Sequence, residues 1–328
     1  MTEFIFGAID GLGHSLGKYA IMTMDVPWNL VKKRIGALPI VVTMVRPPLE
    51  RRYLDHLVAE TPVVDAVVGI GGGVAVDAAK YLAWKRACPL VLVPTALSVD
   101  AYVTPAAGVR EDGIVKYVGN ATAGKVIIDY EAIQSAPKRL NTAGTGDVYS
   151  CRTALYDWKL SHEKTGESYD SGIASQAQRA FDTLLKNASE IEQVSEEGIR
   201  VLVSLHREVN RLQLTAGTPR PEEGSEHTFF YALEEVTHRS FLHGEVVGTG
   251  IYVASHFQSG DADDVASDMD RLGLMFRPRN YGITREEFVA AVLDMKNYSK
   301  RAGLPFSIVN IADITRDETE RLWRRLAS

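Results

Sequence analysis

The chain has 328 residues, of which 45% are hydrophobic and 24% are charged, and its formal net charge at pH 7 is −6. This length and composition predict a globular protein of about two domains and exclude a fibrous or disordered chain. No dense run of Lys or Arg is present, so we expect a small-molecule partner and neither a nucleic acid nor a membrane surface. Without a basic leader or an apolar run of roughly 18 residues, a cytoplasmic location is expected.

The first third of the chain alternates short β-branched runs with amphipathic stretches. This rhythm predicts parallel strands joined by helices that cover both faces of a sheet. Strands are expected at residues 4–7, 18–24, 39–45, 63–70, 90–94 and 126–129, and helices at 28–35, 49–60 and 74–86. The irregular segment from Ala101 to Gly124 mixes Gly, Pro and Thr with Val and Tyr, which is typical of a hairpin or of a loop over a cleft.

After about Ser135 the β-branched runs disappear and helical periodicity takes over, for example at residues 176–193 and 196–214. Pro137, Gly144 and Gly146 mark the transition. The sequence therefore predicts an α/β protein, with a Rossmann-like parallel-sheet domain at 1–136 that binds a dinucleotide. An all-helical domain at 137–328 is expected to bind metal and substrate.

Three consecutive glycines, Gly71, Gly72 and Gly73, follow a buried-strand pattern and open a helical segment. In that setting glycine lets the backbone approach a pyrophosphate, whose charge the N-terminus of the helix favours. The alternative is a tight turn that uses glycine only for its positive φ.

Two further segments fit a dinucleotide. Asp25 stands just past a predicted strand, where its carboxylate can accept hydrogen bonds from both ribose hydroxyls and repel a 2′-phosphate, so NAD is expected over NADP. The alternative is an exposed aspartate that caps a helix. Thr95, Ser98 and Asp100 follow another strand end and offer hydroxyls and a carboxylate, although a plain turn would look the same.

A metal site is expected from Asp147, His227 and His243, each of which lies beside or near glycine. Two imidazoles and one carboxylate supply three ligands to a divalent cation and leave one position open for a reacting oxygen. The glycines that flank the two histidines are expected to let the backbone approach a cofactor. The alternatives are a plain helix N-cap for Asp147 and structural roles for the histidines. Glu226 and Glu245 are expected to orient ligands or to cap helices.

Taken together, these motifs resemble the dehydroquinate synthase-like, iron-containing alcohol dehydrogenase superfamily, and most of all its sn-glycerol-1-phosphate dehydrogenases. The resemblance covers nearly the whole chain and rests on an ordered set of segments: GIGGGVAVDAAK, PTALSVDAYVTPAA, IIDYEAIQSAPKRLNTAGTGD, TALYDWKL, RPEEGSEH and FLHGEVVGTG.

The resemblance implies roles for particular residues and a homo-oligomer. Gly71, Gly72 and Gly73 would bind the pyrophosphate, and Thr95 and Ser98 would contact the nucleotide. Asp77 would lie near the nicotinamide ribose and Asp100 would face the substrate. The ligands of Zn²⁺ or Fe²⁺ would be Asp147, His227 and His243.

The chain departs from the family pattern at two places. Glu222 and Glu223 stand where the family tends to carry a small polar residue, and Tyr231 stands where it tends to carry a second histidine. Two carboxylates near a phosphate pocket would repel a dianion. Arg220 is left as a possible partner for an anion.

The expected function is that of a metal-dependent, NAD(H)-linked alcohol dehydrogenase, similar to glycerol-1-phosphate dehydrogenase. The metal would bind the substrate hydroxyl and stabilise an alkoxide, which releases hydride to the nicotinamide. Asp100, Asp147, His227 and His243 are the expected catalytic residues. One alternative is a dehydroquinate synthase-like cyclase or lyase that uses NAD transiently, and another is a non-catalytic nucleotide-binding protein.

Overall fold

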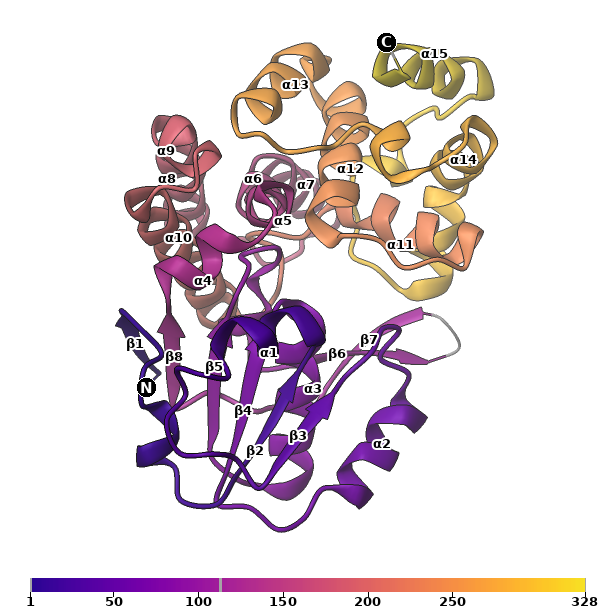
Figure 1. Ribbon diagram of the computed structural model, residues 1–328. Coiled ribbons are helices and arrows are strands. Elements are labelled where there is room, and N and C mark those ends of the chain that lie inside the picture. Colours follow the sequence, from indigo (N-terminus) through magenta and orange to yellow (C-terminus); the bar gives the residue numbers. More distant parts are fainter. Residues whose placement is uncertain (1, 112–113, 328) are drawn as a thin grey trace. The chain divides into compact units, whose positions relative to one another are not determined.

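The structure is a computed structural model that describes residues 2–111 and 114–327. The chain forms two compact units, Met1–Asn141 and Thr142–Ser328 (Figure 1). The expected boundary after residue 136 falls short of this division, which comes after residue 141. Asn141 belongs to the first unit because its side chain accepts a hydrogen bond from the Leu97 amide and donates one to the Ile133 carbonyl, both at 2.9 Å.

A six-stranded parallel sheet forms the centre of the first unit, in the order β1-β8-β5-β4-β2-β3. Every strand expected from the sequence is present, with shifts of a few residues at the ends. The strands are β1 (Glu3–Phe6), β2 (Tyr19–Thr23), β3 (Val41–Met44), β4 (Ala66–Gly71), β5 (Leu90–Pro94) and β8 (Lys125–Ile128). The irregular segment forms the antiparallel hairpin β6 (Ala107–Glu111) and β7 (Ile114–Val118), which confirms the first of its two expected forms.

Helices cover both faces of this sheet, as the pattern of apolar runs predicts. On one face Val68 and Ile70 pack with Val31 and with the segment that follows β1. On the other face a Cβ on Gly69 would lie 2.7 Å from the Ala79 Cβ, so the sheet and α3 are in close contact. The helices of this unit are α1 (Asp25–Val31), α2 (Arg51–Glu60), α3 (Gly73–Arg86), α4 (Tyr130–Ser135) and the start of α5 (Lys138–Ala143), with short turns η1 (Leu12–Ser15) and η2 (Asp100–Tyr102).

The helix expected at residues 28–35 was wrongly placed, because α1 begins at Asp25 and ends at Val31. Pro27 sits in the first turn, where an amide N–H has no partner within the helix, so the missing donor costs nothing. The first helical hydrogen bond runs from the Trp28 amide to the Met24 carbonyl at 2.9 Å. Hydrophobic periodicity missed the first turn because that turn is largely exposed.

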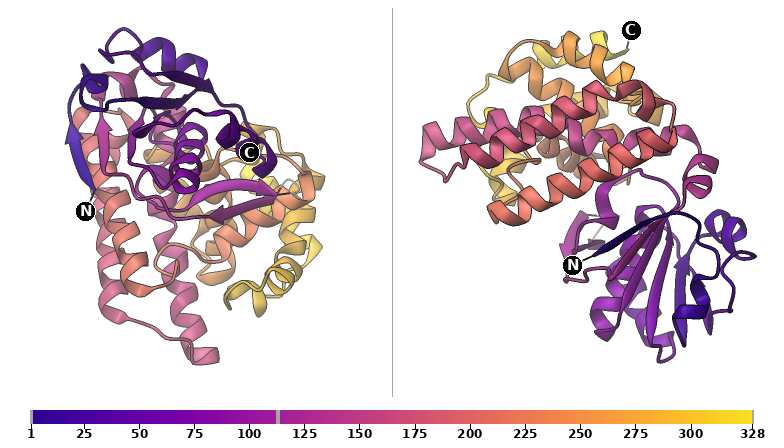
Figure 2. Two further views of the ribbon diagram at one scale, coloured as in Figure 1. Left: turned by 90° about the horizontal axis from the view of Figure 1, so that it is seen from below. Right: turned by 90° about the vertical axis from the view of Figure 1, so that its left-hand side faces the viewer.

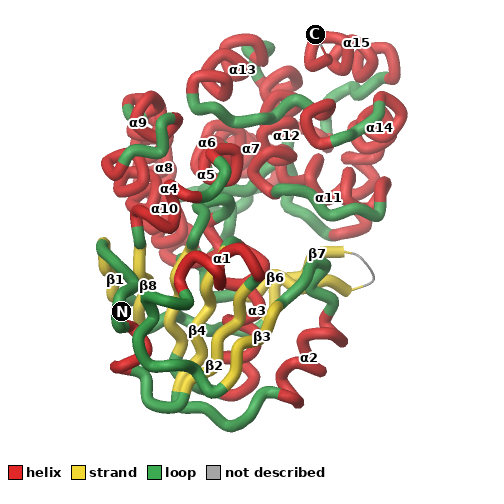
Figure 3. Tube along the Cα trace, in the orientation of Figure 1, coloured by secondary structure: helices red, strands yellow, loops and turns green. Residues whose placement is uncertain are grey.

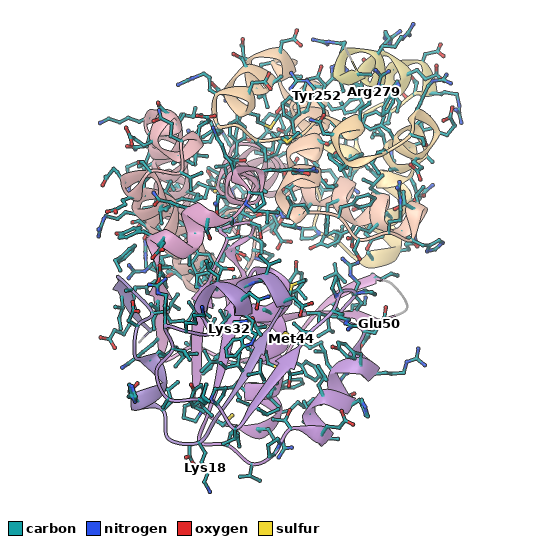
Figure 4. The ribbon with its side chains drawn as sticks, viewed as in Figure 1. Lys18, Lys32, Met44, Glu50, Tyr252 and Arg279 are labelled. Carbon is teal, nitrogen blue, oxygen red and sulfur yellow. The ribbon has the colours of Figure 1, made fainter. Side chains whose placement is uncertain are left out.

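The sheet order reverses between β2 and β4. The chain passes from β2 to its neighbour β3 at the edge, and then returns to β4 on the other side of β2. Parallel α/β sheets bind ligands beyond the carboxyl ends of their strands at such a reversal. In Figure 4 Lys18, just before β2, and Met44, where β3 ends, lie at opposite ends of the sheet and mark its amino and carboxyl edges.

The described residues of the second unit, 142–327, form helices and turns without a strand, as expected (Figure 3). Its long helices α8 and α10 run side by side (Figure 2). The helices are α6 (Thr145–Tyr149), α7 (Cys151–Thr165), α8 (Ser171–Lys186), α9 (Ala188–Glu192), α10 (Glu196–Ala216), α11 (Ser225–Thr237), α12 (His243–Gln258), α13 (Ala262–Arg271), η3 (Pro278–Tyr281), α14 (Arg285–Ala302), η4 (Ile308–Asn310) and α15 (Arg316–Ala327).

The helix expected at residues 176–193 is interrupted. It is divided at Asn187, whose backbone has left the helical region and whose amide contacts the carbonyls that end α8. None of the helices in the described part of the chain is long and apolar enough to cross a bilayer.

His206, on α10, is a buried histidine that the fold keeps neutral. Its side chain is 1% exposed, and its Nε2 lies 2.8 Å from the Gly144 carbonyl oxygen, to which the neutral ring donates. Burial lowers the pKa of His206 from 6.5 to about 4, and the Gly144 hydrogen bond offsets only part of this effect.

We expect His206→Gln to reduce the sensitivity of the fold to acid. Below pH 6.5 the unfolded chain takes up a proton at His206, whereas the folded chain does so only near pH 4, so stability falls over this window. The loss in unfolding free energy between pH 7 and pH 5 should be about 2 kcal/mol smaller in the variant. Urea unfolding followed by circular dichroism measures it.

His56→Gln is the control, because the His56 side chain is 65% exposed, whereas His206 is buried. Its loss of stability between the two pH values should match that of the unmodified chain. Equal acid sensitivity in all three proteins would mean that His206 is readily protonated in the folded chain.

Candidate functional site

The three glycines of the first unit lie at the carboxyl end of β4 and the start of α3, and the structure separates their roles. Gly71 has φ +149°, and a Cβ there would lie 2.8 Å from the Ala75 Cβ, so the fold itself requires glycine. A Cβ on Gly73 would lie 3.0 Å from Val99 Cγ1, which is a tight contact. At Gly72 the nearest atom would be Ser98 Oγ at 3.7 Å, an ordinary contact. Nothing in the protein requires glycine at residue 72, which favours a ligand as the reason for it.

Asp25 lies at the same edge of the sheet. Thr23 of β2 is in register with Ile70 of β4, so Asp25 and Gly71 both follow neighbouring strand ends. Asp25 is exposed and is the first residue of α1, and the helix has no side-chain cap. The alternative role as a capping aspartate is therefore wrong, and the role of the carboxylate toward a ribose stays a prediction.

Thr95 and Ser98 follow β5, the neighbour of β4 on its other side. Both are buried, at 6% and 7% exposure, and the Thr95 amide donates to the Gly71 carbonyl at 3.1 Å. Asp100 begins η2 directly afterwards and is partly exposed. The structure thus brings Gly71–Gly73, Thr95 and Ser98 together at one edge of the sheet.

Lys80 is a buried residue for which the sequence analysis assigned no role. Its Nζ donates to the carbonyls of Ala101 at 2.8 Å and Ala106 at 2.6 Å, and forms an ion pair with Asp77 Oδ1 at 2.8 Å. Burial raises the pKa of Asp77, while Lys80 and the Gly108 amide act in the opposite direction. Asp77, expected near the nicotinamide ribose, is thus also part of the interaction that fixes the segment after Asp100.

In the second unit a contact between glycines brings Asp147 and His243 together. A Cβ on Gly146 would lie 2.5 Å from the Gly244 carbonyl oxygen, and one on Gly244 would lie 1.8 Å from the Ala143 oxygen. Because neither residue has a side chain, α6 and α12 can touch through their backbones. Asp147 Oδ1 and His243 Nε2 are 3.3 Å apart as a result. Gly244 was expected to admit a cofactor; instead it admits protein backbone.

The alternative role of Asp147 as a helix N-cap is also wrong. It is the third residue of α6, which is capped by Gly144, and its side chain is only 3% exposed.

His227 lies on the first turn of α11 and is oriented by Glu226. Its Nδ1 is 2.9 Å from Glu226 Oε1, while the Thr153 hydroxyl donates to Glu226 Oε2 at 2.7 Å. The Gly224 amide donates to Glu226 as well. A carboxylate that is hydrogen-bonded to one ring nitrogen fixes the orientation of the ring and leaves the other nitrogen to coordinate a metal ion. Glu226 therefore has the orienting role that the sequence suggested.

Carboxylates surround His227 and govern its charge. Burial lowers the pKa of His227, but the Glu226 hydrogen bond and the charges of Glu223, Glu226 and Asp147 outweigh it and raise the pKa to about 9. The His227 and His243 rings lie 5.3 Å apart between centroids. The three expected ligands are thus neighbours, from α6, α11 and α12.

The residue types fit a divalent cation. Two ligand atoms at about 2.1 Å from a tetrahedral ion are about 3.4 Å apart, close to the Asp147–His243 distance. Across residues 2–111 and 114–327, however, no group of three or more His, Cys, Asp or Glu side chains is disposed to hold an ion as it stands. Asp147 lies near His243, and His243 lies near His227, but the three side chains do not converge on one point. A cation would have to draw them together.

Asp157 of α7 holds the start of α11 through hydrogen bonds. It is fully buried and accepts hydrogen bonds from the amides of Ser225 and Ile308, both at 2.7 Å. Burial and the neighbouring charge of Glu226 raise the pKa of Asp157 to about 6. The sequence contained no signal for this role, because the partners are 68 and 151 residues away.

Known proteins resemble this chain in sequence and in fold. The family model for iron-containing alcohol dehydrogenase matches residues 32–137. The glycerol-1-phosphate dehydrogenase (NAD(P)+) of Thermoplasma acidophilum is 34% identical over 244 residues, which cover 74% of this chain and 68% of the relative. The Methanospirillum hungatei enzyme of the same name is 32% identical over 305 residues, or 93% of this chain and 84% of the relative.

The fold is shared with solved structures as well. A probable glycerol dehydrogenase from Sinorhizobium meliloti superposes with a TM-score of 0.74 at 20% identity, covering 99% of this chain and 96% of the other. The chain therefore belongs to the iron-containing alcohol dehydrogenase family, which confirms the resemblance. Within this family it is glycerol-1-phosphate dehydrogenase-like, and it is an oxidoreductase that uses a nicotinamide nucleotide.

The glycine turn allows its structural and ligand-binding roles to be tested separately. Gly72→Ala should leave the melting temperature unchanged without ligand, because the added methyl meets only an ordinary contact. It should weaken NAD binding at least about tenfold by occupying the space of the pyrophosphate. Gly71→Ala should lower the melting temperature even without NAD, because of its φ and its contact with Ala75. Thermal unfolding and calorimetric titration with NAD measure the two effects.

Gly7→Ala is the matched control, because an added Cβ there meets nothing within 4 Å. It should change neither quantity. If Gly72→Ala bound NAD as well as the unmodified chain, the assignment of the pyrophosphate to this turn would be wrong.

Proposed function

We propose that this chain is a metal-dependent dehydrogenase that oxidises a hydroxyl group of a small alcohol, or reduces the corresponding carbonyl. NAD(H) is preferred over NADP(H), and the metal is Zn²⁺ or Fe²⁺. The observation that carries the proposal is the meeting of Asp147 with His243, beside a His227 whose ring is already oriented by Glu226. An oligomeric assembly and a cytoplasmic location stay predictions.

The reaction moves a hydride from the alcohol carbon to C4 of NAD⁺, and the hydroxyl proton is released. The products are a carbonyl compound, NADH and H⁺. A divalent cation held by Asp147, His227 and His243 would supply Lewis acidity toward the substrate oxygen.

The protein's own residues position these groups. In the first unit Gly72 leaves room for the pyrophosphate, Ser98 borders that space, and Asp25 offers its carboxylate to the ribose. Asp100 is proposed to contact the substrate, in a segment that Lys80 holds through the Ala101 carbonyl. In the second unit the burial of Asp147 and His227 keeps water away from the cation, while the His243 side chain is 18% exposed.

The test is a screen of alcohols, with added Zn²⁺ or Fe²⁺, that follows NADH by absorbance. We expect one NADH per alcohol oxidised, whereas a cyclase that re-reduces its own cofactor would release none. His243→Ala should bind NAD within about twofold of the unmodified chain, yet lose metal and at least about a thousandfold in kcat, since one of three ligands is gone. Metal analysis after dialysis measures retention.

His256→Ala is the matched control on the same helix. His256 Nε2 lies 2.8 Å from Glu318 Oε1, at the far end of α12 from His243, so metal content and turnover should be retained. A fully active His243→Ala protein would refute the metal site.

The cofactor preference rests on Asp25. Asp25→Gly should raise the ratio of kcat/KM for NADP to that for NAD at least about tenfold, because the repulsion of the 2′-phosphate is removed. Steady-state kinetics with both nucleotides measures it. Glu60→Gln is the control, since it removes the same charge from the end of α2, at the amino edge of the sheet. If the ratio of the two kcat/KM values were unchanged in Asp25→Gly, another residue would have to distinguish the ribose of NAD from that of NADP.

A further inference from the structure

Besides Gly244, helix α12 contains two more glycines, and they face different neighbours. A Cβ on Gly250 would lie 2.3 Å from the Glu226 carbonyl oxygen and 2.9 Å from the Glu226 Cα, so α12 meets the backbone of α11 at this point. A Cβ on Gly248 would instead lie 2.8 Å from the Phe276 Cβ, in the segment that precedes η3. The backbones of α11 and α12 therefore touch at Gly250 and Glu226, directly beside His227.

An aromatic side chain separates the same two helices one turn further along α11. Phe230 is 3% exposed, and its ring meets the His243 ring edge to face, with 4.5 Å between the centroids and 82° between the ring planes. Two aromatic rings favour this arrangement because the positive edge of one faces the negative face of the other. A rotation of the His243 ring would break the contact, so Phe230 restricts the orientation of that imidazole.

The two contacts together define the spacing of α11 and α12, which lie side by side in Figure 1. At Gly250 no side chain lies between the helices, and at Phe230 one ring does. His227 comes between these contacts along α11, and its ring centroid is 5.3 Å from that of His243. The two imidazoles can close on one ion only if the helices keep this spacing, because a metal site tolerates little displacement of its ligands.

We propose that Gly250 and Phe230 are positioning residues for the metal site, and that they act by setting the spacing of α11 and α12. Gly250 places the start of α11, which carries His227, and Phe230 orients the ring of His243. Neither residue has a side chain that could coordinate a cation. This inference rests on the metal-dependent function proposed above and adds to it two residues that the metal itself does not touch.

The experiment titrates the metal-free full chain with Co²⁺, whose visible absorption reports the number and geometry of its ligands. Gly250→Ala pushes the two helices apart, and Phe230→Leu removes the ring between them. Each variant should raise the dissociation constant for Co²⁺ at least about tenfold, as expected when a group that orients a metal ligand is lost. The absorption band of the bound ion should change in both variants. If Gly250→Ala does not fold, Phe230→Leu carries this test alone.

Each variant has a matched control on the same helix. Gly248→Ala adds the same methyl group to α12, but toward Phe276. Phe229→Leu makes the same change on α11, at a ring that packs against Phe288 with 5.7 Å between the centroids. Both controls should lower the melting temperature, because each disturbs a packed contact. They should nevertheless keep the Co²⁺ affinity and the absorption band of the unmodified chain.

A second measurement needs no metal. Histidine-ring signals in NMR spectra of the metal-free chain report the surroundings of each imidazole, and loss of a signal in His227→Gln or His243→Gln assigns it. At one fixed pH the His227 signals should shift in Gly250→Ala and stay in place in Gly248→Ala. Neither substitution adds or removes an aromatic ring, so a shift would reflect a displaced imidazole.

Two results would overturn the proposal. One is a dissociation constant for Co²⁺ within about twofold of the unmodified chain in both variants, with an unchanged absorption band. The other is an equal loss of affinity in the variants and in their controls, because such a loss would follow stability and not the spacing of the helices. If the unmodified chain binds no Co²⁺, the proposed metal-dependent function fails, and the histidine spectra still decide whether Gly250 places His227.

Discussion

The second unit depends on one close approach, that of the backbones of α6 and α12 at Gly146 and Gly244. Any side chain at either position would overlap the facing backbone, since the added atoms would lie 2.5 Å and 1.8 Å from carbonyl oxygens. Helix axes are normally held about 8–10 Å apart by side chains between them, and here that layer is absent. The pairing of Asp147 with His243 is a consequence of this contact, because both side chains project from residues directly next to the glycines.

The orientation of His227 is set differently, through hydrogen bonds. Glu226 joins the ring nitrogen to the Thr153 hydroxyl and to the Gly224 amide, and Asp157 holds the next amide of the same helix start. Buried carboxylates are tolerated only where donors satisfy them, and here each donor belongs to a residue that must be fixed. Burial in this region therefore fixes the orientation of the His227 ring. A side chain that is held in advance loses less entropy when an ion binds.

The sequence was sufficient to predict the first unit almost completely. Its central strands β2, β4 and β5 are buried on both faces and read as continuous apolar runs, and the carboxyl ends of these neighbouring strands place Asp25, Thr95 and Ser98 at one edge. The start of α1 was missed because periodicity reports burial, and the first turn is exposed. The break at Asn187 was missed because Asn is tolerated in helices, and only the local backbone ends α8 there.

The site itself was only partly predictable. Its three metal-ligand candidates stood out by residue type, and Glu226 by its place beside His227. Lys80 and Asp157 did not, because a buried charge is recognisable only from its partners, and apart from Asp77 beside Lys80 those are 21 to 151 residues away. Arg220 illustrates the same limit in reverse. It looked available in the sequence, and its partner Glu167 lies 53 residues distant.

The hydrogen bonds that orient His227 reach its ring through one carboxylate, that of Glu226. The Thr153 hydroxyl of α7 and the Gly224 amide at the start of α11 both donate to that carboxylate. Because these two donors belong to different helices, the position of the ring depends on how α7 and α11 pack against each other, and a substitution that shifts either helix would move the ring as well.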